Sequence, residues 1–512
     1  HPFLARYEVG FDSEGHLEAL RAELISNGGW ALDLSEAILD RALFHVDNAY
    51  YVPHLEVTGR VAKTHMVSFT AFRGFGGPQG MLVIEEALDR IARTLGIDPA
   101  VVRERNLYGD EGEQATTHYG QLIEDNRIGP MWRALADEAE LKARRKAVTA
   151  FNAKSDDIKR GLAVTPVKFG ISFTATFLNQ AGALVNIYAD GTVQVNHGGT
   201  EMGQGLYTKI LGIAMRELGL PAERIRVMKT QTDKVPNTSA TAASSGADLN
   251  GAAVRNACVS LRERLAPIAA SLIAERHGLG ITPERLRFAD GAVGPVDDAS
   301  KAVSFEDVTA AAYVRQVSLS SAGFYRTPGI GYDRVAGKGR PFYYFAFGVA
   351  ATEVEVDGLS GMKRIRRVDI LHDVGDSLNP AIDRGQIEGG FLQGVGWLTG
   401  EELSWDAQGH LLTHSASTYQ VPAFSDAPAE LHVRLLDGAE NANVVHGSKA
   451  VGEPPFMLAI SVREALRDAI AAFGSVEGPL DLPVPATHEA IFHAVQARRG
   501  PSAKPTPTEG ER

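Results

Sequence analysis

The chain has 512 residues, of which 44% are hydrophobic and 22% charged, and its formal net charge is −12. This length predicts two or more domains with buried cores, and an acidic balance without a basic stripe does not fit a nucleic-acid-binding surface. A single cysteine, Cys258, is too few for a disulfide, a structural zinc site or an iron–sulfur cluster. No apolar run is long enough for a membrane span, and no signal peptide is present, so we expect a cytoplasmic globular protein.

Strand and helix signals alternate in the first part of the chain. Residues 1–33 alternate between apolar and polar side chains and are predicted to form strands. Ser35 is the expected N-cap of a helix that continues to His45. Apolar side chains recur with a period near 3.6 in residues 76–96, which predicts an amphipathic helix with the sequence GGPQGMLVIEEALDRIARTLG.

Further along, Asp98 and Pro99 fit the N-cap and first position of another helix. Residues 137–160 are charged and helical in pattern, and we expect them to connect two domains with a boundary near residue 160. The dipeptide Asp190–Gly191 lies between two alternating runs and predicts a hairpin with a tight type I′ turn. A second strand pair is predicted over residues 352–374.

These signals together predict an α+β fold with mixed sheets and flanking helices. Residues 498–512 are rich in proline and polar side chains, and they are predicted to be a disordered tail. No solenoid period or low-complexity tract is present. Cys258 lies on the apolar side of a predicted helix, where packing explains it.

Five loops combine small residues with an amide, hydroxyl or charged group, and at least three of them lead directly into predicted helices. They read RGFGGPQG, GGTEMGQG, TSATAASSGADLNG, DRGQIEGGFLQGVG and KAVGEPP. Starting at Gly74, a dinucleotide fingerprint fails because Gln79 replaces the third glycine, and no phosphate-binding GxxxxGK[ST] loop occurs. Glycine turns and helix N-termini expose backbone N–H groups, so five such loops indicate a large, polar, phosphate-bearing ligand.

The order of several motifs resembles the molybdenum-binding part of the xanthine dehydrogenase/molybdenum hydroxylase family, over roughly residues 1–495. The motifs are DRALFHVDN, TAFRGFGGPQ, FLNQAGAL, HGGTEMGQGL, PNTSATAAS, SLNPAIDRGQIEGGFLQG and SKAVGEPP. The resemblance implies two molybdopterin-binding domains, residues 1–160, incomplete at its N-terminus, and residues 161–497. It also implies that molybdopterin holds the molybdenum without a direct protein ligand.

The resemblance assigns the chemistry to a few side chains. Glu453 matches the glutamate that takes a proton during hydroxylation, and its neighbouring glycine and prolines would fix it within hydrogen-bond reach of that proton. Arg41 matches an arginine that orients the purine, and its place on the inward side of a predicted helix agrees with this role. Phe75 and Phe173 match two aromatic residues that sandwich a flat heteroaromatic substrate, and Thr174 is a candidate hydrogen-bond partner of that substrate.

A further set of residues matches the family's cofactor-binding positions. In this set, Gln204 and Gln386 offer side-chain amides, and Ser244 offers a hydroxyl to the phosphate region. The predicted cofactor-binding residues are Arg73, Met202, Gly203, Gln204, Ala242, Ala243, Ser244 and Gln386.

The pattern also departs from the family. A GGKE-like loop with a second active-site glutamate is absent, and the chain opens at His1 rather than methionine, so we expect a missing upstream segment to complete the pocket. The resemblance places the 2Fe–2S clusters and FAD on other domains or chains of a higher oligomer. The electron acceptor, NAD or oxygen, is left open.

The leading hypothesis is molybdenum-dependent hydroxylation of a purine, hypoxanthine or xanthine to urate, in purine catabolism, with water as the oxygen source. The alternative is an aldehyde or other N-heterocycle hydroxylase of the same family. A carbon monoxide dehydrogenase is disfavoured because that branch has a cysteine in the loop that contains Phe75 here. A non-catalytic cofactor-binding scaffold and a nicotinamide dehydrogenase are weaker alternatives.

Overall fold

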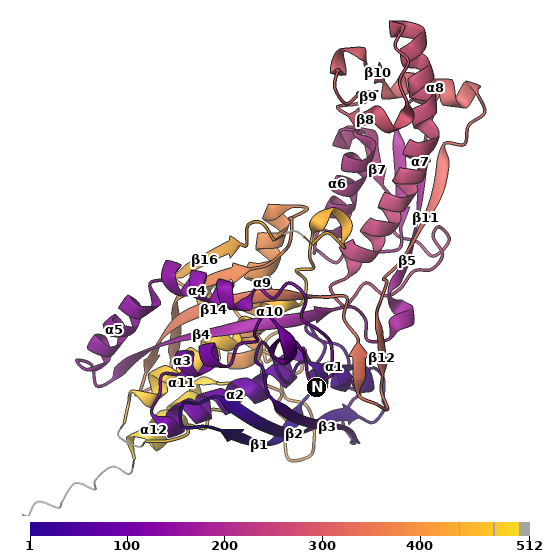
Figure 1. Cartoon of the computed structure of the whole chain (residues 1–512). Coiled ribbons are helices and arrows are strands. Elements are labelled where there is room, and N and C mark those ends of the chain that lie inside the picture. The colour runs from indigo at the N-terminus through magenta and orange to yellow at the C-terminus, as the bar shows by residue number, and fades with distance from the viewer. Residues whose placement is uncertain (440, 475–476, 501–512) are drawn as a thin grey trace, which may run out of the picture.

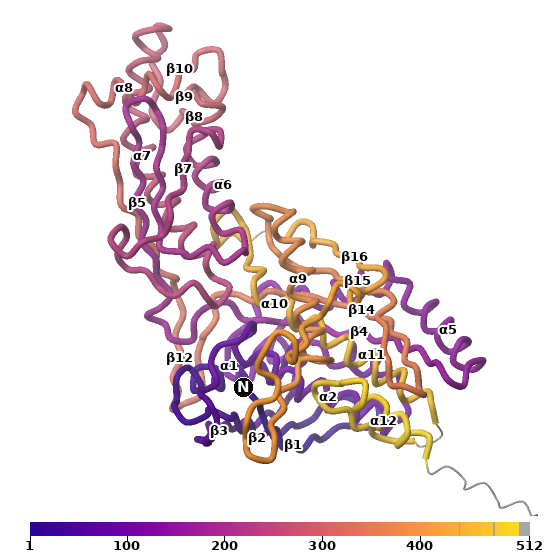
Figure 2. The backbone as a smooth tube through the Cα atoms, turned by 180° about the vertical axis from the view of Figure 1, so that it is seen from behind, coloured from indigo at the N-terminus to yellow at the C-terminus, as the bar shows by residue number. Residues whose placement is uncertain are grey.

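The computed structural model describes residues 1–439, 441–474 and 477–500. These residues form a broad body and a lobe that projects from it (Figures 1 and 2). The chain passes from the body into the lobe after β4 (Ile158–Ile171) and returns after β11 (Ser320–Arg326). No helix in the described ranges combines the length and the apolar character needed to cross a lipid bilayer.

The N-terminal residues form a three-stranded mixed sheet at the base of the body. β1 (Phe3–Phe11) and β2 (Leu17–Gly29) are antiparallel, whereas β2 and β3 (His54–Lys63) are parallel. Helices α1 (Ser35–Phe44) and α2 (Gly77–Leu95) pack against each other and against this sheet. Apolar side chains from both layers fill the interface, including Leu20, Leu24, Leu39, Ile84 and Leu88.

The inner face of α2 is not purely apolar, because two of its carboxylates are buried. Glu85 and Asp89 are 0% and 1% exposed. Arg103 of α3 (Pro99–Arg105) lies 2.7 Å from Glu85, and Arg467 lies 2.7 Å from Asp89. An unpaired buried charge is costly. The ion pairs therefore make it possible for carboxylates to occupy inward-facing positions of α2, where the helical period predicts apolar side chains.

The body is built on a four-stranded mixed sheet with the strand order β16–β15–β14–β4. Its members besides β4 are β14 (Tyr344–Asp357), β15 (Lys363–His372) and β16 (Glu430–Leu435). Both faces are covered, which explains why β4 is buried along almost its whole length. Helices α4 (Ile128–Glu138) and α5 (Leu141–Asn152) pack on one face. The other face is covered by α9 (Pro380–Thr399), α10 (Pro454–Met457), α11 (Ile460–Ala471) and α12 (His488–Arg499).

The lobe has its own core between a sheet and helices. Its main sheet has the order β11–β5–β6–β7, with β5 (Gln180–Ile187), β6 (Val193–His197) and β7 (Ile225–Val227). Helices α6 (Leu206–Leu218) and α7 (Gly246–His277) pack against each other, and α7 also packs on β5 and β11. Cys258 of α7 is 0% exposed within this core, so its predicted packing role is confirmed.

The tip of the lobe carries smaller elements, and a short ribbon lies where the chain re-enters the body. The tip consists of β8 (Leu286–Ala289), β9 (Ala292–Pro295), β10 (Val303–Ser304) and α8 (Phe305–Val314). The ribbon pairs β12 (Gly331–Asp333) with β13 (Lys338–Arg340). In both views α6 and α7 begin at the base of the lobe, close to the body (Figures 1 and 2).

Most predicted elements are confirmed, with local corrections. Ser35 is the first helical residue of α1 rather than its N-cap, which is Leu34. Asp98 is confirmed as the N-cap of α3, because its side chain accepts a hydrogen bond from Ala100 N at 2.8 Å. The hairpin at 183–199 is confirmed, but of its two turn residues only Gly191 has a positive φ (79°), so the predicted type I′ turn is wrong.

The predicted boundaries need more correction. Residue 160 lies inside β4 rather than in a helical connection, because helix α5 ends at Asn152. One core cluster combines Phe44 and Trp132 with Phe342, so the regions 1–160 and 161–497 share packed side chains. Residues 498 and 499 belong to α12, not to a disordered tail, and residues 501–512 lie outside the described residues.

Candidate active site

Segments that are distant in the sequence meet where the lobe joins the body. Arg73, in the loop before α2, connects three of them. Its Nε donates to Gly452 O at 2.7 Å, its Nη1 to Gln393 Oε1 at 3.2 Å and its Nη2 to Gln386 O at 3.3 Å. The guanidinium therefore ties the turn before α10 to α9, and two of the predicted cofactor-binding residues, Arg73 and Gln386, are in contact.

Two glycines of α9 allow this close packing. A Cβ atom at Gly390 would lie 2.9 Å from Arg73 Nη2, and a Cβ atom at Gly394 would lie 2.2 Å from Phe456 O. Real Cβ atoms do not approach a carbonyl oxygen that closely, so only glycine permits α9 and α10 to lie at this distance. The backbone of α9 therefore sets the position of the turn that carries Glu453.

Glu453 lies at the N-terminus of α10, directly before two prolines, and is half-buried. Ser244, in the loop before α7, contacts it twice. Glu453 N donates to Ser244 Oγ at 2.7 Å, and Ser244 Oγ donates to Glu453 Oε2 at 2.8 Å. A hydroxyl has one hydrogen to donate, so the hydrogen that sequence analysis assigned to the phosphate region is used by Glu453 in this structure.

The residues before Glu453 are fastened to the sheet and to α7. The ammonium of Lys449 lies 2.5 Å from Asp373 Oδ2, and both groups are buried. Ala450 N donates to the hydroxyl of Tyr344 at 2.8 Å, and this hydroxyl donates to Asp248 Oδ2 at 2.7 Å. Burial raises the pKa of Asp248 to about 6, although the Tyr344 hydrogen bond and the charge of Lys209 oppose it.

Arg41 is 1% exposed, so its predicted inward orientation is confirmed. Its Nη1 donates to Gly170 O at 2.9 Å and its Nη2 donates to Ser172 O, whereas its Nε has no hydrogen-bond partner among the residues that the structure describes. Burial lowers the pKa of Arg41, and the negative charge of Glu453 opposes that shift. The guanidinium therefore holds the backbone that leads into Phe173, with one N–H still free.

The rest of the DRALFHVDN motif also binds β4, and sequence analysis did not assign these residues. Gly170 N donates to His45 Nε2 at 3.0 Å, and Asn48 Nδ2 donates to Pro166 O at 2.9 Å. Asp47 pairs with the buried Lys168 at 3.3 Å. Burial works against the charge of Asp47, but Lys168 and His118 bring its pKa down to about 2. The motif thus fixes α1 to the strand that ends beside Phe173 and Thr174.

The two predicted stacking residues lie on loops of different regions. Phe75 is half-buried and has a positive φ of 50°, between Gly74 (φ 95°) and Gly76 (φ 91°). Phe173 is also half-buried, and its backbone N–H and C=O are both bound by the Asn179 side chain, at 2.8 and 2.9 Å. The rings of Phe75 and Phe173 do not pair with each other, so the substrate sandwich stays a prediction.

The 198–205 loop of the lobe is closed by its own side chains. Gln204 accepts from Met202 N at 2.5 Å and donates to Thr200 O at 2.8 Å, so its amide is engaged within the loop. Glu201, which sequence analysis missed, accepts from the N–H groups of Gly203, Gly205 and Tyr207 at 2.9–3.0 Å. Burial opposes its charge, but these donors lower its pKa. The only signal for this role was an acidic residue within a glycine loop before a helix.

Polar atoms that were not predicted lie close in the chain to the other predicted cofactor positions. Ala243 and Ser244 have φ values of 54° and 56°, and the N-cap residue of α7, which starts two residues after Ser244, makes no side-chain capping hydrogen bond. His197 Nε2 and Asn250 Oδ1 are buried without a hydrogen-bond partner in the described residues, and Ala242 and Met202 are exposed nearby in the chain. These groups can bind a ligand that offers both donors and acceptors.

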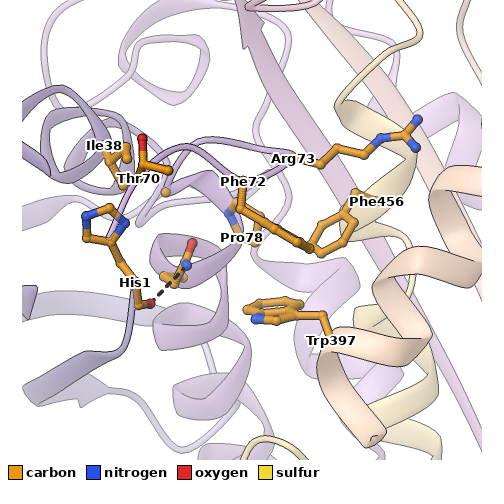
Figure 3. A pocket seen from close by; sticks show the side chains of 10 residues that line it. His1, Ile38, Thr70, Phe72, Arg73, Pro78, Trp397 and Phe456 are labelled. Carbon is orange, nitrogen blue, oxygen red and sulfur yellow. Dashed lines mark hydrogen bonds between the residues drawn. The ribbon is translucent and has the colours of Figure 1, made fainter. Parts of the chain in front are cut away.

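A narrow crevice lies on the far side of the Arg73 loop (Figure 3). Its volume of about 10 Å³ is enough for roughly one water molecule, so it cannot admit a purine. Phe72, Phe456 and Trp397 fill it, with ring centroids 5.6 Å apart for Phe72–Phe456 and 5.3 Å for Trp397–Phe456. Arg73 also lines this crevice (Figure 3), and its Nε binds Gly452 O in the turn before Glu453.

The fold and the converging loops define a class of protein. A family model described as "Molybdopterin cofactor-binding domain" matches residues 134–428, and a second model with the same description matches residues 1–107. The chain belongs to the molybdopterin cofactor-binding domain family, and the predicted family and α+β fold with mixed sheets are confirmed.

The relatives narrow this class. The chain is 45% identical over 511 residues to xanthine dehydrogenase/oxidase of Gallus gallus, covering 99% of this chain and 35% of that protein. It is 44% identical over 501 residues to xanthine dehydrogenase of Oryza sativa subsp. japonica, covering 96% of this chain and 34% of that protein. The chain therefore spans about a third of the length of these relatives.

Solved structures share the architecture. Quinoline 2-oxidoreductase from Pseudomonas putida 86 superposes with a TM-score of 0.84 at 26% identity, covering 97% of this chain and 62% of that chain. A Cu,Mo-CO dehydrogenase superposes with a TM-score of 0.81 at 20% identity, covering 96% and 61%, which shows the fold alone.

The open polar atoms of the site fit a molybdopterin. This cofactor has a phosphate and a ring system rich in donors and acceptors, and the uncapped start of α7, His197 Nε2 and Asn250 Oδ1 can serve both. In the described ranges, no group of three or more His, Cys, Asp or Glu side chains is placed to hold a metal ion.

Proposed function

We propose that this chain is the molybdopterin-binding part of an enzyme that hydroxylates hypoxanthine or xanthine to urate. The 45% and 44% identities to xanthine dehydrogenases support this substrate class. Water supplies the oxygen, and two electrons and two protons leave for each C–H bond that becomes C–OH. When bound, the molybdenum cofactor supplies the two-electron acceptor for this oxidation.

One observation carries the proposal: Glu453 is held in a turn stiffened by two prolines, where Arg73, Ser244 and α9 converge. Only Oε2 of its carboxylate is bound within the described residues, so Oε1 is open to accept the proton of the water-derived nucleophile. A base of this kind must be held within hydrogen-bond reach of the proton it takes.

The other side chains bind and orient the substrate. The free Nε of Arg41 can donate to a purine oxygen or to negative charge that develops on the ring. Phe75 and Phe173 stack on the ring faces, and Thr174 adds a hydrogen bond. The cofactor is held by the Arg73 loop, the 202–204 and 242–244 loops and Gln386, within the regions 1–160 and 161–497.

The remaining parts of the machinery lie outside this chain. The chain matches about a third of the xanthine dehydrogenases, and its single cysteine cannot hold a 2Fe–2S cluster. We infer that 2Fe–2S clusters, FAD and the upstream part of the pocket belong to other segments or subunits of a cytoplasmic oligomer.

The decisive experiment measures molybdenum content and purine-dependent dye reduction of the complete enzyme, with and without Glu453→Ala. A general base typically contributes about 10²- to 10⁴-fold, so turnover should fall by at least that range while molybdenum content and fold are kept. Substantial residual turnover would refute the role of Glu453. Molybdenum binding without oxidation of any substrate would support the cofactor-binding scaffold instead.

An aldehyde or N-heterocycle hydroxylase is the second candidate, favoured by the superposition on quinoline 2-oxidoreductase. Arg41→Met separates the two. If the substrate is a purine, the variant should lose xanthine turnover but keep aldehyde oxidation; equal loss of both would show that Arg41 supports the loop at Ser172 rather than the purine.

A further inference from the structure

We propose that Ser244 is a positioning residue for Glu453: its hydroxyl fixes which carboxylate oxygen faces the reacting proton. This inference rests on the proposed function, because it assigns Glu453 as the base. It replaces the phosphate-binding role that the sequence suggested for the Ser244 hydroxyl.

Ser244 contacts Glu453 at its backbone N–H and at its carboxylate, and so restricts the side chain at both ends. The Ser244 hydroxyl accepts from the main-chain N–H of Glu453 at 2.7 Å and donates to the side-chain Oε2 of the same residue at 2.8 Å. One atom thus links the backbone and the carboxylate of the base, which limits rotation about the intervening side-chain bonds. Oε2 is engaged, and Oε1, without a partner in the described residues, is left for chemistry.

The backbone on both sides of the contact places the Ser244 hydroxyl beside Glu453. It has a φ of 56° and follows Ala243, which has a φ of 54°, and helix α7 begins two residues later. A Cβ atom at Gly452 would lie 2.9 Å from Ser244 Oγ, so the glycine before the base lets the hydroxyl approach. Arg73 holds that glycine through its carbonyl oxygen at 2.7 Å.

The charged groups near Glu453 differ from the Ser244 hydroxyl in how they act on its carboxylate. The charged groups that face Glu453 from neighbouring elements are Arg41 of α1 and Arg73 of the loop before α2. Both are cations, but among the described residues neither donates a hydrogen bond to a Glu453 carboxylate oxygen, so neither selects one oxygen in that way. The Ser244 hydroxyl makes that choice, because a hydrogen bond acts on one oxygen at one distance.

The test compares Ser244→Ala, Ser244→Cys and Ser245→Ala in the complete enzyme. Alanine fits this backbone conformation, as Ala243 shows next to it. Cysteine keeps the size with a weaker donor, and Ser245, whose hydroxyl donates only to Ala242 O at 3.2 Å, is the matched control. The readouts are kcat, KM and molybdenum content.

Loss of positioning should lower kcat of Ser244→Ala by about 10- to 100-fold, the size of effect expected for a slightly misplaced catalytic group. KM and molybdenum content should change little, so the loss should appear in kcat rather than in KM. Ser244→Cys should fall between wild type and Ser244→Ala, and Ser245→Ala should stay within about twofold of wild type.

Other outcomes overturn the inference. Unchanged kcat in Ser244→Ala would show that the hydroxyl does not orient the base. Loss of molybdenum in proportion to activity would return Ser244 to the cofactor. The double variant Ser244→Ala/Glu453→Ala should have the same kcat as Glu453→Ala alone. Full activity of Glu453→Ala alone would defeat the proposed function, whereas an inactive Glu453→Ala beside a normal Ser244→Ala would defeat only this inference.

Discussion

The turn at 449–455 and the loop at 198–205 both precede helices and both carry an acidic residue among glycines, yet they are built in opposite ways. The 449–455 turn is fastened to distant elements through Lys449, Ala450 and Gly452. In the 198–205 loop, Glu201 binds the N–H groups of its own loop and helix, and Met202 is 65% exposed. The orientation of Glu453 depends on long-range contacts, whereas the shape of the 198–205 loop comes from local ones.

Among the substitutions in the 449–455 turn, Lys449→Met should have the largest effect. The substitution leaves Asp373, which is 0% exposed, without its cation. Removing one partner of a buried ion pair typically costs about 3–5 kcal/mol, so thermal unfolding of the complete protein should occur at a clearly lower temperature. The double variant Lys449→Met/Asp373→Asn should recover much of this loss; an equally unstable double variant would mean that the pair itself is not the cause.

Asp248 of α7 connects the lobe, through Tyr344, to the 449–455 turn, and the pH dependence of stability tests its role. Burial raises the pKa of Asp248 to about 6, above its ordinary 3.8. A raised pKa means that the folded state binds the proton more tightly, so this contribution to the free energy of unfolding is complete below pH 3.8 and is lost as pH rises through 6. The loss amounts to about 3 kcal/mol. Asp248→Asn should flatten the pH dependence of denaturant midpoints between pH 4 and 6, and an unchanged slope would contradict this assignment.

Gly452→Ala gives a smaller effect on the same turn. The added methyl group would lie 2.9 Å from Ser244 Oγ, and Gly452 does not have a positive φ, so the contact alone is tested. We expect about a tenfold lower kcat with little change in KM. Gly212→Ala in α6, where a Cβ would meet nothing within 4 Å, is the matched control. Equal kcat values for the two variants would argue against a tight approach at Gly452.

The smallest effect should come from a substitution in the 198–205 loop. Glu201→Gln keeps the size but loses the charge that accepts three backbone N–H groups at the start of α6. Loss of such a cap costs about 1 kcal/mol, and molybdenum content should fall because Met202 and Gly203 move. The exposed Glu223→Gln is the control. A stable variant with normal molybdenum content would show that the loop holds its shape without Glu201.

Local signals predicted the elements, and the motif order predicted the family. The apolar period of α2 and the Asp98 cap are short-range features, so sequence was sufficient for both. The partners of Arg41 could not be predicted, because they lie at the end of β4 and directly after it, about 130 residues away, and are carbonyl oxygens that carry no side-chain signal. The ion pairs of Glu85 with Arg103 and of Asp89 with Arg467 were missed because these arginines lie on other helices, α3 and α11.

The candidate site was predicted residue by residue, but the use of each polar group was not. Gln204 is in the expected loop, yet its amide turns inward because Thr200 O and Met202 N lie within reach. Ser244 was predicted to bind the cofactor, yet its hydroxyl binds Glu453. Sequence motifs locate such residues, and only the packing of the loops decides which neighbour takes each hydrogen bond.

The absence of a Cβ atom at Gly394 of α9 has a practical consequence. Because the Phe456 carbonyl would lie 2.2 Å from a methyl group there, the gap between the two helices is as small as the backbone allows. Any larger residue would act as a spacer and shift the turn that carries Glu453 outward without changing the chemistry of its carboxylate. This one position on α9 therefore controls how far the Glu453 carboxylate reaches.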